Sequence, residues 1–164
     1  MSEERDRSDE AAARSTEGGV TMELVEEIHE AFNTRDAEVI AGYFAEDAVF
    51  FMASGPDPHG RAVSGRDAIR KTLADRFAVI PDMGWDLLYG YTAGQRAVTV
   101  WRVHGHAADG TTLDYQGCDL WEFHGGLVQR KDTYWKIVRP GDPWASAADG
   151  GGGHRNPGPE PLDK

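Results

Sequence analysis

The amino-acid sequence predicts an α+β domain in which helices pack on one side of an antiparallel sheet. Three observations indicate this fold class. Helical periodicity is confined to the first half of the chain, three long runs rich in Val, Thr, Tyr, Trp and Phe follow in the second half, and short Gly-containing segments join those runs. Such residues favour strands, and Gly supplies the positive φ of tight hairpins, so the second half is predicted to be a meander. Helices segregated from an antiparallel sheet make an α+β domain.

The chain has 164 residues, enough for one domain with its own hydrophobic core. We expect this domain to span residues 20–143. Residues 1–19 are charged or small, and residues 144–164 are dominated by Gly and Pro. Neither segment can bury enough apolar surface to offset the entropy of ordering, so both are predicted to be disordered tails.

Composition excludes several classes of function. A net charge of −11 argues against nucleic-acid and membrane partners, because both need a basic surface. No apolar run approaches the roughly 20 residues of a membrane span, and the N-terminus has no apolar signal segment. The single cysteine, Cys118, fits a reducing compartment, so a cytoplasmic protein is expected. No Walker, dinucleotide or zinc-ligand spacing is present, so no cofactor and no metal are predicted.

The helices are predicted from apolar residues that repeat every three or four positions. The first helix begins after Thr21, an N-cap residue, and residues 33–36 end it. A shorter helix follows, and a third begins at residues 65–67. The inward positions are Leu24, Ile28 and Phe32 in the first helix, Val39, Ile40, Tyr43 and Phe44 in the second, and Ile69, Leu73 and Phe77 in the third. His29 is expected to be exposed.

The strands are predicted from runs of β-branched and aromatic residues. A short apolar strand over residues 48–52 precedes a Pro- and Gly-rich loop over residues 53–65. The sheet then begins at residues 85–91 and continues through the meander. The three meander strands are predicted over residues 97–106, 112–123 and 127–137.

Alternation along these strands predicts two faces, because residues two apart point the same way. If the hairpin registers match, one face combines ionisable and aromatic side chains, as the wall of a ligand pocket does. Its residues are Arg102, His104, Tyr115, Asp119, Trp121, Asp132 and Tyr134. The opposite face is apolar and is therefore predicted to form a homodimer interface. Its residues are Trp101, Val103, Leu120, Thr133 and Trp135.

The pocket residues suggest acid/base catalysis. His104 and Asp132 could transfer a proton, since His titrates near neutrality and a carboxylate fixes its tautomer. Asp119, between Leu120 and Trp121, could stay protonated and donate to a developing oxyanion. The alternatives are structural: Asp132 and Arg102 could form a cross-strand ion pair, and His104 could be a hydrogen-bonded histidine of the sheet.

The order of elements and the segments "FAEDAVF", "GRDAIRKTLADRF" and "LWEFHGGLVQRKDTYWK" resemble the SnoaL-like branch of the nuclear transport factor 2-like superfamily. That superfamily includes polyketide cyclases, ketosteroid isomerases and limonene-epoxide hydrolases. The resemblance covers about residues 20–138 and implies a curved sheet that closes with three helices around a conical pocket. This fold hosts many chemistries, so the reaction depends on the residues of the site.

The resemblance also suggests roles for individual residues. The cyclases place an acid/base Asp at the position of Asp132, and the isomerases place an oxyanion-stabilising Asp at the position of Asp119. The Arg-x-Asp pair of the epoxide hydrolases resembles residues 102–104, with His104 in place of Asp. Their water-positioning Tyr and Asn fall near Phe50 and Met52, which cannot hydrogen-bond a water molecule.

Together these observations predict a small-molecule enzyme with cofactor-free acid/base chemistry. The expected reaction is cyclisation or isomerisation of an apolar polyketide-, steroid- or terpenoid-like substrate. The alternatives are an epoxide hydrolase and a non-catalytic ligand-binding or dimerisation module. The predicted catalytic residues are Asp132, His104, Asp119 and Arg102, and the predicted substrate contacts are Tyr43, Phe50, Met52, Tyr115, Trp121 and Tyr134.

Overall fold

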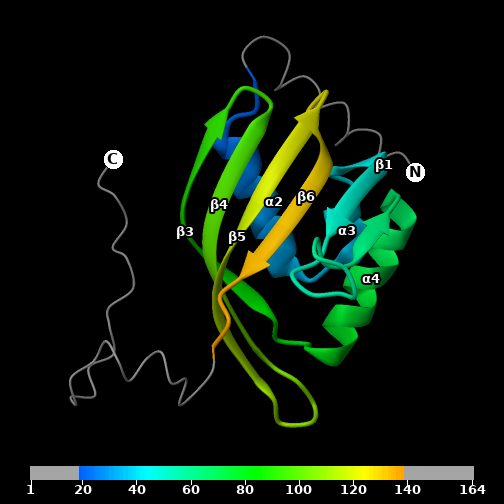
Figure 1. Cartoon of the computed structure of the whole chain (residues 1–164), viewed down its shortest axis with the longest axis vertical. Helices are drawn as coiled ribbons and strands as arrows, with labels where there is room; N and C mark the ends of the chain where they lie inside the picture. Colours follow the sequence, from blue (N-terminus) through cyan, green and yellow to red (C-terminus); the bar gives the residue numbers. More distant parts are fainter. Residues whose placement is uncertain (1–18, 139–164) are drawn as a thin grey trace, which may run out of the picture.

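The computed structural model describes residues 19–138, which form three helices and a six-stranded sheet (Figure 1). Apart from Gly19, the predicted tails lie outside the described residues. The helices are α2 (Met22–Thr34), α3 (Ala37–Ala41) and α4 (Arg66–Val79). The strands are β1 (Phe44–Phe51), β2 (Ala62–Ser64), β3 (Gly84–Ala93), β4 (Arg96–His106), β5 (Thr112–His124) and β6 (Leu127–Trp135). This arrangement confirms the predicted α+β fold.

The strand order is β2-β1-β6-β5-β4-β3. Strands β3 to β6 form the predicted antiparallel meander, and β2 pairs antiparallel with β1. The β1–β6 pair is parallel, so the sheet is mixed rather than purely antiparallel. A parallel pair needs a long crossover connection. Along the chain, the connection from β1 to β6 includes α4 and the first three strands of the meander.

The helix ends follow the local signals in the sequence. The Leu24 backbone N–H donates to the Thr21 hydroxyl at 3.3 Å, so Thr21 caps α2 as predicted. The Asp36 carboxylate accepts from two backbone N–H groups at the start of α3. The second helix is shorter than predicted, because α3 ends at Ala41 and Phe44 already belongs to β1.

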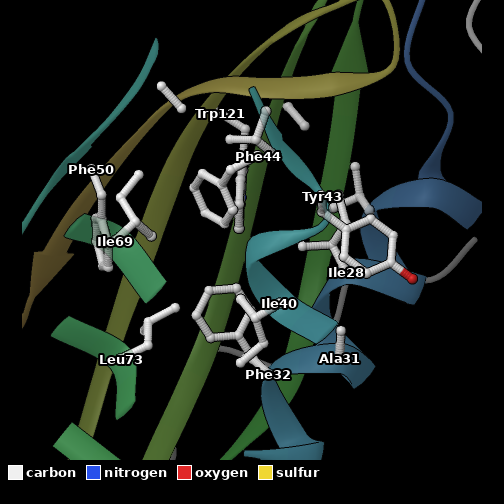
Figure 2. Close-up of a cluster of buried hydrophobic side chains, with 14 of the residues drawn as sticks. Ile28, Ala31, Phe32, Ile40, Tyr43, Phe44, Phe50, Ile69, Leu73 and Trp121 are labelled. Atoms are coloured by element: carbon white, nitrogen blue, oxygen red, sulfur yellow. The ribbon is translucent and has the colours of Figure 1, made fainter. Parts of the chain in front are cut away.

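The helices cover one face of the sheet, where the core forms. Helix α2 crosses the sheet and packs against β3, while α4 packs against β1 and β2 (Figure 1). Figure 2 shows side chains from α2, α3, α4 and the sheet meeting in one buried cluster. Its members include Ile28, Phe32, Ile40, Phe44, Phe50, Ile69, Leu73 and Trp121.

The registers of the meander differ from those predicted. Between β4 and β5, Thr99 pairs with Asp119 and Arg102 pairs with Gln116, so Arg102 and Asp119 point to opposite faces. Burial explains this choice: Trp101 and Val103 are at most 1 % exposed and lie on the inner face of β4. Turning Arg102 inward would have sent both apolar residues into water.

A β-bulge sets the register between β5 and β6. Near the turn, Phe123 pairs with Val128, a register that would bring Asp132 opposite Asp119. The register then shifts by one residue, since Glu122 pairs with Arg130. As a result Thr133, not Asp132, lies opposite Asp119. One extra residue in one strand reverses the faces beyond it, which is why the predicted β6 face was wrong.

The predicted dimer face is therefore wrong in most of its members. Four of its five residues face the helices: Trp101, Val103, Thr133 and Trp135. Only Leu120 lies on the outer face, where it is 42 % exposed. The large apolar side chains that were expected at an interface fill the interior instead.

Gly117 allows the Trp101 indole to lie across β5. A Cβ atom at Gly117 would overlap the backbone oxygen of Tyr134 and sit 2.5 Å from Cη2 of Trp101. We predict that Gly117→Ala lowers the free energy of unfolding by about 1–3 kcal/mol, because both the indole and the backbone of β6 have to move. Urea denaturation would measure the change. Gly42→Ala is the matched control, since its Cβ would meet nothing closer than 3.4 Å; equal effects of the two substitutions would contradict the role of Gly117.

Candidate active site

A buried cluster of polar side chains lies on the inner face of β4, β5 and β6. Asp119 Oδ1 accepts hydrogen bonds from Lys131 Nζ and from the Thr133 hydroxyl, both at 2.6 Å. Asp119 Oδ2 accepts from Trp101 Nε1 at 2.8 Å. Lys131 Nζ also donates to Thr133 Oγ1 at 2.7 Å. Three donors thus surround the Asp119 carboxylate, an arrangement that suits an acceptor rather than the neutral donor predicted from the sequence.

Aromatic rings enclose this ion pair. Asp119 and Lys131 are each only 4 % exposed. Lys131 Nζ lies 4.5 Å from the ring centroid of Phe50 and 5.0 Å from that of Trp121, distances at which cation–π attraction applies. Charge–charge, hydrogen-bond and ring contacts together offset the cost of removing both charges from water.

The cluster forms one wall of a small inner chamber of about 20 Å³, which has room for about one water molecule. Residues from α2, α4 and five strands line it: His29, Phe32, Phe50, Arg76, Trp85, Trp101, Asp119, Trp121, Lys131, Thr133 and Trp135. Six of these eleven side chains are Phe or Trp. These rings make the small space apolar, and the larger space for a ligand, about 240 Å³, lies in the chamber next to it.

An outer chamber adjoins the inner one. Both chambers are lined by Phe50, Arg76, Thr133 and Trp135, so these four residues mark their junction. Met52 and Tyr115 belong to the outer chamber. The Tyr115 ring stacks on Trp135 with centroids 5.6 Å apart, which fixes the orientation of that indole.

Burial controls the ionisation of the basic groups around the inner chamber. It lowers the pKa of Lys131, and nearby Arg76 lowers it further, while the Asp119 carboxylate acts in the opposite direction. Burial likewise lowers the pKa of Arg76, against the attraction of Asp119. The pKa of His29 also falls because burial outweighs the nearby carboxylate. His29 is 5 % exposed, so its predicted exposure was wrong.

The structure brings five of the ten predicted site residues to the two chambers. Asp119 and Trp121 line the inner chamber, Met52 and Tyr115 line the outer chamber, and Phe50 lines both. Trp121 also donates from Nε1 to the Thr99 hydroxyl at 3.0 Å, which holds its ring in place.

The other predicted catalytic residues lie on the outer face of the sheet. Arg102 forms two hydrogen bonds to the exposed carboxylate of Asp114, at 2.7 and 3.0 Å, rather than pairing with Asp132. His104 lies 3.7 Å from Asp86. Asp132 accepts from Arg130 at 3.3 Å. The predicted His104–Asp132 pair is therefore not formed, because His104 lies opposite Asp114 on β5 and Asp132 lies opposite Leu120, six residues further along that strand.

The last two predicted contacts also lie away from the chambers. Tyr134 is 54 % exposed on the outer face, where its hydroxyl approaches Asp132 at 3.4 Å. Tyr43 is buried in the core, as Figure 2 shows, and its hydroxyl donates to Glu27 at 2.8 Å. It lines neither chamber.

Three residues of the site were not predicted from the sequence: Lys131, Arg76 and Thr133. Each interrupts an apolar pattern. Arg76 follows Leu73 by three residues on the buried stripe of α4, and Lys131 alternates with Thr133 and Trp135 along β6. A charged residue at an otherwise buried position is costly, so these breaks in periodicity were the available signal.

Two further observations bear on the kind of site. Within residues 19–138, no group of three or more His, Cys, Asp or Glu side chains is placed to hold a metal ion. In the same range, no helix is both long and apolar enough to cross a membrane.

The SnoaL-like domain family matches residues 25–131, about two thirds of the chain. The chain belongs to the SnoaL-like domain family. The matched range runs from α2 to Lys131 and includes Arg76 and Asp119. No curated protein matches the chain.

Solved structures share the fold of this SnoaL-like domain. A protein with a ketosteroid isomerase-like fold from Catenulispora acidiphila, in complex with trimethylamine, is 20 % identical with a TM-score of 0.63 and covers 72 % of this chain and 88 % of its own. A candidate SnoaL-like polyketide cyclase from Jannaschia is 17 % identical with a TM-score of 0.61, and the match covers 70 % of this chain and 84 % of that one. TerC, co-crystallised with polyporic acid, is 20 % identical with a TM-score of 0.59, and the match covers 70 % of this chain and 90 % of TerC.

The lowered pKa of His29 predicts a loss of stability in acid. Below the usual pKa of 6.5 the unfolded chain takes up a proton that the folded domain resists. The free energy of unfolding should therefore fall as the pH drops from 6.5 to 5, by at most about 1.4 kcal/mol per pH unit from this residue. His29→Gln should reduce that slope, and His124→Gln, at an exposed position, should leave it unchanged. Thermal melts across the pH range test this; equal slopes for all three proteins would contradict it.

Proposed function

We propose that this SnoaL-like domain is an enzyme that moves a proton on a small conjugated molecule, without a cofactor, during a cyclisation or an isomerisation. One observation carries the proposal. A carboxylate and an ammonium group meet at 2.6 Å in the wall of a chamber built mainly from aromatic side chains. Charges of this kind are costly to bury, and they concentrate at sites that transfer protons.

Asp119 is the proposed base. Its Oδ2 accepts one hydrogen bond, from Trp101, and each carboxylate oxygen can accept two. Oδ2 takes a proton from a carbon next to a carbonyl group of the substrate. The electron pair of the broken C–H bond moves to the carbonyl oxygen and forms an enolate. A dry, preorganised site favours this step, since few solvent dipoles must reorganise.

Lys131 stabilises the enolate. Its Nζ uses two of its three hydrogens on Asp119 and Thr133, which leaves one for the developing oxygen. Return of the proton to another carbon completes an isomerisation. Attack of the enolate carbon on a second carbonyl of the same molecule completes a cyclisation, with the proton going to the new alkoxide.

The fold neighbours support a small organic ligand. One is a candidate polyketide cyclase, and another was co-crystallised with polyporic acid. The aromatic side chains that line the outer chamber support the same class of ligand, because flat rings gain from stacked and edge-to-face contacts.

A ligand-binding module without catalysis is the second candidate. The hydrogen bonds within the cluster favour it: both oxygens of Asp119 and the Thr133 hydroxyl already have partners. In that case the cluster fixes the shape of the chamber and takes no part in a reaction.

Hydrogen–deuterium exchange of 2-tetralone in D₂O separates the two candidates. This ketone has acidic C–H groups beside an aromatic ring, so it reports proton abstraction directly. We predict that the domain accelerates exchange at C1 above the buffer rate and that Asp119→Asn lowers this acceleration by about 10²-fold, the usual contribution of a positioned base. Proton NMR measures the rate. Binding of the ketone without faster exchange would favour the module.

Variants that keep the fold are needed for this test. Asp119→Asn alone leaves Lys131 buried and unpaired, which should cost about 3–5 kcal/mol of stability. Asp119→Asn combined with Lys131→Met removes both charges and should restore much of the melting temperature without restoring exchange. Asp132→Asn tests the prediction from the sequence that Asp132 is the acid/base residue. Loss of exchange in that variant alone would replace Asp119 by Asp132 as the base.

We also propose that the domain forms a homodimer through the outer face of the sheet. Tyr91 and Leu120 flank Val98 on adjacent strands, and Tyr91, Leu120 and Tyr134 are 42–58 % exposed. Exposed apolar patches of this kind are typical of interfaces. Leu120→Arg should convert the dimer to a monomer in sedimentation at tens of micromolar, a concentration that populates dimers with micromolar affinity. A monomeric wild type would refute the proposal.

A further inference from the structure

Arg76 is attracted by the Asp119 carboxylate but forms no ion pair with it. It lies on the buried stripe of α4, between Leu73 and Phe77, and lines both chambers. Within residues 19–138 its guanidinium makes no hydrogen bond and no ion pair. Arg70 on the same helix differs, because it is exposed and pairs with Glu38 at 2.6 Å. A half-buried guanidinium without partners is costly, so Arg76 is poised to receive an acceptor from a ligand.

A second donor at the same place lacks an acceptor. The Trp135 Nε1–H is buried and makes no hydrogen bond in the described residues. Trp135 lines both chambers together with Arg76, and stacking on Tyr115 holds its ring. An indole N–H can only donate, so its partner must be an acceptor that the protein itself does not supply.

The charges around the inner chamber favour an anion. The lining includes two cationic side chains, Arg76 and Lys131, and one carboxylate, Asp119. Asp119 is committed to Lys131 at 2.6 Å, so the charge of Arg76 is left over. The whole chain has a net charge of −11, which makes a cationic chamber exceptional within it. Low-dielectric walls strengthen such a local charge.

We propose that the junction of the two chambers is a subsite for the carboxylate of a conjugated or aromatic acid, bound by the Arg76 guanidinium and the Trp135 Nε1–H. The planar fork of Arg matches the two oxygens of a carboxylate. The apolar part of the ligand lies in the outer chamber, beside Phe50 and Tyr115. This inference rests on the proposed function, because it names the substrate class of that same site.

Two matched probes test the subsite, 2-naphthoate and its neutral counterpart 2-naphthamide. They share one shape and differ in charge. The wild-type domain should bind 2-naphthoate at least about 10-fold more tightly, as expected when hydrogen bonds to a charged group are lost. Isothermal titration calorimetry measures both affinities. Equal affinities, or no saturable binding of 2-naphthoate below about 1 mM, the level of a very weak complex, would overturn the proposal.

Substitutions locate the donors. Arg76→Met should weaken 2-naphthoate binding about 10- to 100-fold and leave 2-naphthamide nearly unchanged. Trp135→Phe keeps the ring but removes the donor, and it should weaken 2-naphthoate by about 3- to 10-fold. Arg70→Met is the matched control on the same helix, where an exposed pair contributes little and binding should not change.

Melting temperatures separate a binding role from a structural one. If Arg76 binds a ligand anion, Arg76→Met removes an uncompensated charge, so the melting temperature should stay or rise. A lower melting temperature with unchanged 2-naphthoate affinity would assign Arg76 to the scaffold and overturn the proposal. The double substitution of Asp119→Asn with Lys131→Met isolates this inference from the proposed function: it should abolish proton exchange on 2-tetralone but keep the preference for 2-naphthoate over 2-naphthamide.

Discussion

The ion pair between Asp119 and Lys131 is the constraint on which the rest of the site depends. Transfer of two charges from water to a protein interior costs several kcal/mol per ion unless each group is well paired. Here Thr133 and Trp101 complete the hydrogen bonds of Asp119, and aromatic rings face the ammonium group of Lys131. Every strand register that would separate these groups leaves a charge buried without a partner, so the pair specifies how β4, β5 and β6 align.

The space around this pair comes from residues that contribute shape rather than charge. Gly117 leaves room for the Trp101 indole, whose Nε1 then reaches Asp119. The Trp101 and Trp135 rings meet edge to face with centroids 6.1 Å apart, so the wall of the chamber is itself a packed aromatic layer. Rigid rings hold polar groups in fixed positions, which favours both catalysis and selective binding.

The inner chamber and its junction with the outer chamber differ in their electrostatics. Around Lys131 the charge is neutral overall, and the hydrogen bonds to Asp119 and Thr133 leave one hydrogen of Nζ and one acceptor position of Asp119 Oδ2 for a substrate. At the junction with the outer chamber, Arg76 and Trp135 offer donors without acceptors. A substrate with an acidic group at one end and a carbonyl group at the other would engage both regions, and its charge would set its orientation relative to Asp119.

The sequence alone determined the α+β class, the helix cap at Thr21, the meander and its hairpin positions, because these depend on local propensity and short-range hydrogen bonds. It also identified Asp119, Trp121 and Phe50 as pocket residues. The tertiary structure alone decided which face each strand turns inward. A single bulge between Glu122 and Phe123 turned Lys131 and Thr133 inward in place of Asp132. Burial of Trp101 turned Arg102 and His104 outward. Alternation gives two equivalent faces, and only packing against α2 and α4 distinguishes them.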